Sequence, residues 1–418
     1  MSHRRTFIMG LVLVLYACAA PALPTPTPPP HPTATRPAEA PPTAPQPCGD
    51  GRCDAAEQAH PNRCPQDCVA RTPSPAPIAA ATPSPGAAAA PTAYLTFVVN
   101  VHDWVHHDQS AAAVQRLAAL FARYGVRGDF YFTAPVARAY AEHHPDVVAY
   151  LRATGMTVSY HVRAPHPLTA GFTGPLEGLT GPDLLQAVQD YETYRLDLTT
   201  GGLDRSQPGG YTYVAQVFGR PPVTVAASAG SPWREAARQV YAALGARVVV
   251  EEHEAGADPH QPFRFVQGLL VRPVDFSVTR VDLGQGRQNF WWNLLPSPQA
   301  ETAHPVAQLQ AGLADWQAQG YGRPPFVLAH IHDNNFYRRG SVAWGAYYYA
   351  IDAHGNKTTP LDPPFDLHAS DPSTPRSAAE QAAIWQAYED LVAYAAAHVQ
   401  VITSADLLPL AAAAGQQP

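Results

Sequence analysis

The sequence predicts an α/β fold, a distorted (β/α) barrel of about seven parallel strands, over residues 94–410. Short runs rich in β-branched and aromatic residues alternate with longer segments of helical periodicity, which is typical of a largely parallel sheet. Histidines and acidic residues recur directly after the apolar runs. The chain before residue 94 is rich in Pro, Ala and Thr, a composition that favours a disordered stalk outside the barrel.

The expected elements have recognisable ends. Ser110 is expected as the N-cap of a helix whose apolar residues fall on one face, and Gly125 ends that helix. Pro232 is suited to the first position of a later helix. The expected strands cover residues 94–101, 128–133, 156–160, 223–227, 246–250, 326–331 and 399–403. The expected helices cover residues 110–124, 135–154, 182–196, 305–319 and 381–397, with one more beginning at 231.

The N-terminus carries a targeting signal. Arg4 and Arg5 precede an apolar run over residues 7–16, which is too short to span a bilayer but long enough for the apolar part of a signal peptide. The run ends Leu-Tyr-Ala-Cys18, which resembles the lipobox of bacterial lipoproteins. That resemblance implies a signal peptide over residues 1–18, a lipid anchor on Cys18 and a place on the cell surface; a plain secretory signal is the alternative.

Two linkers, residues 19–47 and 69–93, bracket a cysteine-rich island over residues 48–68. Of the five cysteines of the chain, four lie in this island: Cys48, Cys53, Cys64 and Cys68. In an oxidising compartment they predict two disulfides, whose pairing stays open. The island is either a calcium module, as its Asp and Gly residues suggest, or a disulfide-stapled spacer. No cysteine follows residue 68, so the main domain has no thiol nucleophile and no Cys-ligated zinc.

The charge of the chain argues against a nucleic-acid partner. The formal net charge is −7 and the sequence contains no basic run. Nucleic-acid binding relies on clustered Lys and Arg, so we expect no such partner.

Polar residues stand at the ends of three expected strands. His102 and Asp103 end the first strand, and His161 ends the third, with His166 five residues later. His330, His332 and Asp333 end the late strand. In parallel α/β folds, functional side chains collect at the carboxyl ends of the strands.

Two imidazoles and one carboxylate form a zinc-type ligand set that leaves one position open for water. We therefore expect Asp103, His161 and His166 to hold a divalent metal ion, with zinc as the first choice. Each residue by itself has an ordinary alternative, since strand-end Asp residues cap helices and histidines are common on surfaces.

The order of motifs resembles the polysaccharide deacetylase family, the metal-dependent carbohydrate esterases, over residues 94–408. Thr96-Phe97 leads to the terminal Asp103, and a helix ends in Tyr124-Gly-Val. The Phe-rich strand of residues 130–132 follows, then Gly155-Met-Thr-Val-Ser-Tyr-His161. The late strand contains Val327-Leu-Ala-His330, and residues 401–407 match the closing segment of the family. The resemblance implies an acetylated glycan as substrate.

The sequence departs from the family at three positions. The family has two adjacent acids after its first strand, a base and a metal ligand, where this chain has His102-Asp103. The two metal histidines of the family are four residues apart, whereas His161 and His166 are five apart. The Arg-containing motif of the family aligns with residues 226–230, which lack an arginine. The chain is therefore interpreted as a divergent member.

The resemblance implies metal-assisted hydrolysis, in which metal-bound water attacks an acetyl carbonyl. His102 would be the base, His330 or His332 the acid, and backbone N–H groups near Ser228 and Ala229 would stabilise the oxyanion. A deacetylase-like domain that has lost activity and only binds glycan is the alternative.

Other motifs support weaker hypotheses. His106, His107 and Asp108 either extend the site or form a solvated turn. Glu251-Glu-His-Glu254 could supply an acid at the rim, and Trp344 with residues 347–349 is expected on a surface loop where sugar rings could stack. Trp291 and Trp292 are expected in the core.

Two rival classes stay open. Ala226-x-Ser228-x-Gly230 lies between a strand and a helix, as a serine nucleophile elbow does, and would make the protein a serine hydrolase. A non-enzymatic surface adhesin or solute-binding lipoprotein would also suit the long Pro/Thr-rich stalk.

Overall fold

The computed structural model describes residues 92–250, 258–278, 281–282, 288–289, 305–339, 343–353 and 357–417. The predicted signal peptide, Cys18, the cysteine island and both linkers as far as residue 91 lie outside the described residues. The same holds for residues 251–254 and for Trp291 and Trp292.

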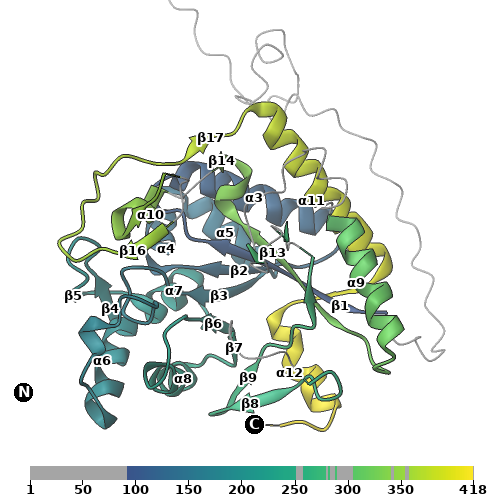
Figure 1. Cartoon of the computed structure of the whole chain (residues 1–418), viewed down its shortest axis with the longest axis horizontal. Coiled ribbons are helices and arrows are strands. Elements are labelled where there is room, and N and C mark those ends of the chain that lie inside the picture. The colour runs from purple at the N-terminus through teal and green to yellow at the C-terminus, as the bar shows by residue number, and fades with distance from the viewer. Residues whose placement is uncertain are drawn as a thin grey trace, which may run out of the picture. The chain divides into compact units, whose positions relative to one another are not determined.

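The centre of the domain is one curved sheet of ten strands (Figure 1). Its strand order is β10-β13-β1-β2-β3-β6-β7-β9-β8, with β18 also paired to β1. All pairs are parallel except the hairpin of β8 and β9. The α/β class and the largely parallel, curled sheet are thus confirmed. In the described part of the chain the two end strands, β10 and β8, do not pair, so the sheet is a half-barrel.

The strands of this sheet are β1 (Tyr94–Val101), β2 (Asp129–Phe132), β3 (Thr157–His161), β6 (Thr224–Ala226), β7 (Val248–Val250), β8 (Arg264–Val266), β9 (Leu269–Val271), β10 (Phe276–Ser277), β13 (Phe326–His332) and β18 (Gln400–Ile402). Among the described residues, four antiparallel pairs lie outside it: β4 (Tyr194–Leu196) with β5 (Leu203–Pro208), β11 (Val281–Asp282) with β12 (Gln288–Asn289), β14 (Arg338–Arg339) with β17 (Thr374–Pro375), and β15 (Tyr349–Ile351) with β16 (Lys357–Pro360).

Helices surround the sheet (Figure 1). They are α3 (His107–Arg123), α4 (Ala134–His143), α5 (Pro145–Ala153), α6 (Gly181–Thr193), α7 (Gly210–Phe218), α8 (Trp233–Leu244), α9 (Pro305–Gln319), α10 (Ala343–Tyr348), α11 (Ala378–His398) and α12 (Ser404–Ala413), with short 3₁₀ turns η1 (Gly174–Leu176) and η2 (Asp333–Phe336). None of the described helices combines the length and the apolar character that crossing a bilayer requires.

Two predicted helices differ from the structure near the site. The first begins at His107, not after Ser110, so the prediction of Ser110 as N-cap is wrong. The Ser110 hydroxyl instead donates to Asp333 Oδ2, a tertiary bond that a local capping rule cannot foresee. The single helix expected over residues 135–154 is divided into α4 and α5. Pro145 causes the break, because it has no N–H and its ring would clash with the preceding turn of α4.

The core is formed by the buried strand residues and the apolar faces of the helices around them. In α3 the predicted apolar face is confirmed, with Val114, Leu117 and Phe121 fully buried. A second apolar cluster contains Ala164, Phe172, Trp344, Tyr347, Tyr348 and Phe365. Trp344 is only 3 % exposed, so its expected place on a surface loop is wrong; it lies in α10, where this cluster buries it.

Candidate functional site

The parallel register of β1 and β13 brings four polar side chains to one end of the sheet. Asn100 lies opposite His332, and Val98 lies opposite His330. Alternate residues of a strand face the same side, so Asn100 shares its side with His102, and His330 shares its side with His332. Contacts between these side chains follow from this register.

The side chains at this end form a continuous polar network. Asn100 Nδ2 lies 2.6 Å from His330 Nε2 and 3.1 Å from His332 Nε2. His332 Nδ1 lies 3.2 Å from His102 Nε2, which also lies 3.1 Å from Asn334 Oδ1. The predicted residues His102, His330 and His332 are thus brought together.

The contact with Asn334 Oδ1, with the amide as placed, fits a proton on Nε2 of His102. An amide oxygen only accepts, so His102 Nε2 must donate to it. His102 Nδ1 is then the nitrogen with the lone pair, and it is buried without a hydrogen-bond partner among the described residues. The ring of His102 is therefore oriented with a proton acceptor available at Nδ1.

The same assignment extends through His332. The one N–H of His102 Nε2 is then shared between Asn334 Oδ1 at 3.1 Å and His332 Nδ1 at 3.2 Å, so His332 Nε2 carries a proton and needs an acceptor. A half-turn of the Asn100 amide exchanges oxygen and nitrogen without moving the rest of the side chain. The amide oxygen can then accept from both His330 Nε2 and His332 Nε2.

Two buried carboxyl groups lie beside this network. Asp103 accepts from the backbone N–H of His106, from His106 Nδ1 and from the Tyr337 hydroxyl, all at 3.0–3.1 Å. Burial by itself would raise the pKa of Asp103, but these bonds, above all that from His106, lower it. Asp333 accepts from Ser110 and from the backbone N–H of Asp103. Burial, followed by the charge of Asp103, raises the pKa of Asp333 to about 7.

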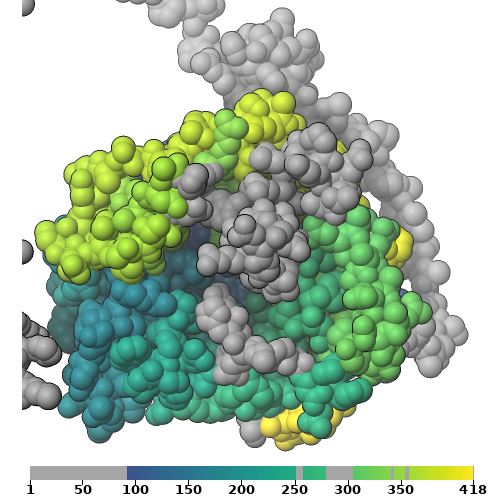
Figure 2. All heavy atoms as spheres, in the orientation of Figure 1, coloured from purple at the N-terminus to yellow at the C-terminus, as the bar shows by residue number. Residues whose placement is uncertain are grey.

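A pocket opens next to these groups, and three of the predicted histidines line it. Figure 2 shows this face of the domain hollowed beside the yellow-green atoms of the segment that contains α10. The pocket is lined by His102, Trp104, Thr133, Ala134, Pro135, Tyr160, His161, Val162, Arg163, Ala164, His166, Tyr191, Leu196, Leu198, Gly210 and Trp344. His330 and His332 are not part of this lining.

The histidines of the pocket are neutral. Burial, and then the positive charge of Arg163, lowers the pKa of His102 to about 3. The same two causes lower the pKa of His161 well below its usual value, and burial lowers that of His166 to about 3. The rings of His102 and His161 are stacked with centroids 6.3 Å apart. Neither ring nitrogen of His161 has a hydrogen-bond partner among the described residues.

His166 belongs to a different polar group from Asp103. Its Nε2 lies 3.4 Å from Glu192 Oε1, and its Nδ1 accepts from the backbone N–H of Leu168. Glu192 also accepts from the Tyr241 hydroxyl at 2.5 Å and from the backbone N–H of Tyr211 at 2.9 Å. Burial raises the pKa of Glu192 to about 7.

The predicted metal ligands do not converge on one point. In the described part of the chain, three ligand atoms of His, Asp or Glu residues lie within 4.8 Å of one another only at His107, Asp108 and His144. Asp103, His161 and His166 do not form such a set, because Asp103 is held by His106 and Tyr337 while His166 is turned to Glu192. As arranged here they do not fit one ion, and this ligand set stays a prediction.

Sequence reasoning missed four residues that shape the site: Asn100, Arg163, Glu192 and Asn334. Arg163 and Asn334 stand two residues after His161 and His332, so a search of strand-end segments could have found them. Arg163 supplies positive charge to a pocket whose arginine was thought to be lost. Asn100 and Glu192 are marked by no local pattern.

Two expectations about Ser228 are changed by its contacts. The backbone N–H groups of Ser228 and Ala229 both donate to the Leu168 carbonyl, at 3.2 and 2.9 Å, so they cannot form the expected oxyanion hole. The Ser228 hydroxyl accepts from the backbone N–H of Ala170 and does not line the pocket. This bond engages the hydroxyl with the backbone and not with a histidine, so the described residues do not support a serine nucleophile.

The chain was compared with known proteins. No family model and no curated protein sequence matches it. A structure from Mycobacterium smegmatis reported as a polysaccharide deacetylase is similar, with TM-score 0.43 and 13% identity over 80% of this chain and 94% of that one. An allantoinase structure gives TM-score 0.40 and 11% identity over 77% and 91% of the two chains. A polysaccharide deacetylase structure reported from Pseudomonas aeruginosa PAO1 gives 0.40 and 12%, over 76% and 90%.

Proposed function

We propose that the chain is a hydrolase that removes acetyl groups from a glycan outside the cytoplasm. The observation that carries the proposal is the pocket in which His102, His161 and His166 lie together with Trp104. The motif order of the sequence, which resembles the polysaccharide deacetylases, gives the reaction class. Trp104 is half-buried in the wall and offers a flat apolar face to a sugar ring.

The chain's own residues supply a base. A water molecule beside His102 loses its proton to Nδ1 as its oxygen attacks the acetyl carbonyl carbon. Asp333 Oδ1 lies 3.7 Å from His102 Nε2, so an ionised Asp333 stabilises the imidazolium that forms. The C–N or C–O bond to the sugar then breaks, the proton passes from His102 to the leaving atom, and acetate is released. Arg163 places positive charge near the developing oxyanion.

The zinc ion expected at Asp103, His161 and His166 belongs to this proposal as a prediction only. When bound, such an ion supplies a Lewis acid and lowers the pKa of a bound water. The two unpartnered nitrogens of His161 are suited to a ligand, whereas the carboxylate of Asp103 would first have to leave His106 and Tyr337. No step above is assigned to the ion.

Binding of glycan without turnover is the second candidate. It is favoured by the low pKa of His102, about 3, because a weakly basic imidazole is a poor proton acceptor. Release of acetate from acetylated chitin-oligosaccharides, peptidoglycan and xylan tests both candidates. Acetate release by wild type that is lost in His102→Ala supports the hydrolase. Measurable binding to one glycan with no acetate from any of the three supports the binder.

The proposed location is the outer face of a membrane, with the lipid on Cys18 as the anchor. The basic start, the short apolar run and Cys18 support it. A Cys18→Ser variant should leave the membrane fraction and appear in the soluble exported fraction; retention in the membrane would contradict the anchor.

A further inference from the structure

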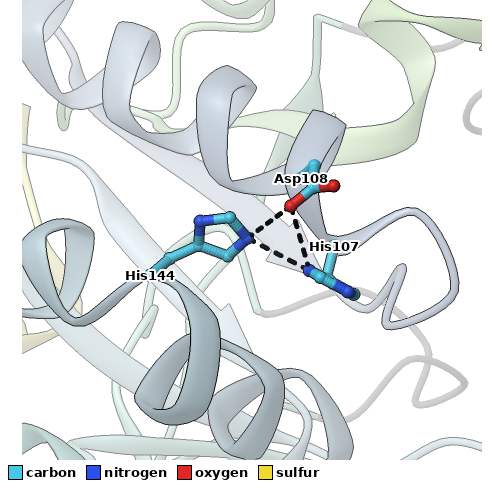
Figure 3. Close-up of side chains that lie close together, drawn as sticks. All are labelled: His107, Asp108 and His144. Atoms are coloured by element: carbon cyan, nitrogen blue, oxygen red, sulfur yellow. Dashed lines mark hydrogen bonds and ion pairs between the residues drawn. The ribbon is translucent and has the colours of Figure 1, made fainter.

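The structure assigns a second site to the chain: we propose that His107, Asp108 and His144 bind a divalent zinc-class ion on the surface of the domain. His107 Nδ1 lies 3.0 Å from His144 Nε2. Asp108 Oδ1 lies 3.4 Å from His107 Nδ1 and 3.0 Å from His144 Nε2. One atom from each residue thus forms a triangle, in which all three side chains point to a common centre (Figure 3).

The triangle has the size that zinc requires. Zinc binds imidazole nitrogen and carboxylate oxygen at about 2.0–2.2 Å in a tetrahedron, whose ligand atoms are then about 3.3–3.5 Å apart. The three separations here, 3.0–3.4 Å, are at or just below that spacing. An ion above the triangle would reach all three atoms with only a small outward movement.

The surroundings leave the fourth position to solvent. The side chain of Asp108 is 80 % exposed, while those of His107 and His144 are 29 % and 19 % exposed. The two imidazoles are therefore partly shielded and the carboxylate faces water. None of the three residues lines the pocket of the candidate active site, so the triangle is a separate site.

The backbone holds the ligands in place from two separate elements. His107 and Asp108 occupy the first turn of α3, and His144 occupies the junction where Pro145 separates α4 from α5. The backbone N–H of His144 donates to the Tyr140 carbonyl, and its carbonyl accepts from Val147 and Val148. An ion would therefore join α3 to the α4–α5 junction, 37 residues apart in the sequence.

Such a link stabilises the folded chain. The unfolded chain does not hold the three ligands together, so an ion that binds the folded state shifts the folding equilibrium toward it. The link is also connected to the candidate active site. Ser110 of α3 contacts both Tyr140 of α4 and Asp333, the carboxyl group beside His102. The ion would thus strengthen contacts that hold Asp333.

The alternative is a hydrogen-bonded triad without metal affinity. In that case His107 Nδ1 and His144 Nε2 form a hydrogen bond with each other, and Asp108 Oδ1 lies beside both rings. Zinc titration distinguishes the two, because a proton-linked triad gives no specific zinc response.

The test is titration of the full, metal-stripped chain with zinc chloride, followed by calorimetry and by the shift in melting temperature. We expect Asp108→Asn and His144→Gln to weaken the affinity for one zinc ion by at least about tenfold. Even the loss of a residue that is hydrogen-bonded to a metal ligand lowers metal affinity by that much. His143→Gln is the matched control, because its exposed ring stacks on His107 at 4.8 Å without belonging to the ligand set. Zinc bound at any other site of the chain is expected to be the same in wild type and in all of these variants.

Asp108→Asn keeps the test valid if His144→Gln disturbs the helix junction, because Asp108 is exposed. Equal zinc affinity in wild type and Asp108→Asn, with an unchanged melting shift, would overturn the proposal. The same holds if His161→Gln removes all zinc binding while Asp108→Asn keeps it, since the ion would then belong to the pocket. Loss of acetate release alone bears on the proposed function and leaves the zinc result unaffected.

Discussion

Asn334 Oδ1 lies 3.1 Å from His102 Nε2, and this contact gives the His102 ring its direction. Both residues are almost fully buried, His102 at 4 % and Asn334 at 2 % exposure. The ring is held on one side by Asn334 and His332 and meets the edge of Trp344 at 5.4 Å between ring centroids. A base that is fixed in this way presents Nδ1 in a single orientation.

The first prediction concerns this pair. His102→Ala should reduce acetate release by about 10²- to 10⁴-fold, the usual contribution of a general base. Asn334→Ala should reduce kcat by about 10- to 100-fold with little change in KM, as losses of groups that orient an active imidazole do. Both rates are measured on the acetylated glycan that gives the highest wild-type activity.

Asn335→Ala is the control for this pair, because Asn335 is the next residue of η2, where its backbone carbonyl accepts from Arg376 Nε. A kcat loss in Asn335→Ala equal to that in Asn334→Ala would show that the effect comes from packing of η2 rather than from orientation of the imidazole.

How much of this site the sequence could predict depends on the range of the contacts. The end of β1 at His102 and Asp103, and the end of β13 at His332, follow from local alternation and were predicted. The contact of His102 with Asn334 joins residues 232 apart and depends on the parallel register of β1 and β13. The contact of Asp103 with the Tyr337 hydroxyl is equally long-range, joining residues 234 apart, and no local pattern predicts it.

The second prediction is that the main domain folds without the N-terminal region. Tyr94 begins β1, the Ala93 carbonyl accepts from Gln400, and the Thr92 hydroxyl donates to the His398 carbonyl. A chain that begins at Thr92 keeps all of these bonds. Its melting temperature should equal that of the longer exported chain. If the short chain aggregates while the longer chain stays soluble, the main domain does not fold independently and the prediction is wrong.

The third prediction concerns the serine rival. Ser228→Ala should leave acetate release within about twofold of wild type, because the hydroxyl accepts from Ala170 and lies outside the pocket lining. A serine-directed covalent inhibitor should label neither protein at residue 228. Complete loss of activity in Ser228→Ala, with an unchanged melting temperature, would restore the serine hydrolase.

The fourth prediction is steep loss of stability in weak acid. Burial lowers the pKa values of His102, His161, His166, His330 and His332 in the folded chain, whereas the unfolded chain takes up protons near pH 6.5. Stability is therefore present above pH 6.5 and is lost as the pH falls below it. Each histidine contributes at most about 1.4 kcal/mol per pH unit, so the five together contribute at most about 7 kcal/mol per pH unit.

A loss of that size exceeds half of the stability of an ordinary domain within one or two pH units. With EDTA present to remove metal ions, the melting temperature should fall sharply between about pH 6.5 and pH 5. His368→Gln, which removes an exposed histidine, should leave the curve unchanged. A melting temperature that does not change with pH over this range would contradict the prediction. It would show that the five histidines take up protons in the folded chain as readily as in the unfolded chain.

The last prediction concerns Glu192, whose trend with pH has the opposite sign. Burial raises its pKa from 4.5 to about 7, so ionisation costs the folded chain stability as the pH rises from 4.5 through 7. The full cost is about 3–4 kcal/mol, because the pKa rises from 4.5 to about 7 and each pH unit corresponds to about 1.4 kcal/mol. Glu192→Gln keeps the shape, and its amide oxygen can still accept from the backbone N–H of Tyr211. The variant should be more stable than wild type at pH 8, and its advantage should shrink toward pH 6.

Denaturant unfolding at pH 6, 7 and 8 measures the difference, with the exposed Glu142→Gln as control. An advantage that stays constant with pH, or a variant less stable at pH 8, would mean that Glu192 is held ionised, with His166 as its charged partner at 3.4 Å.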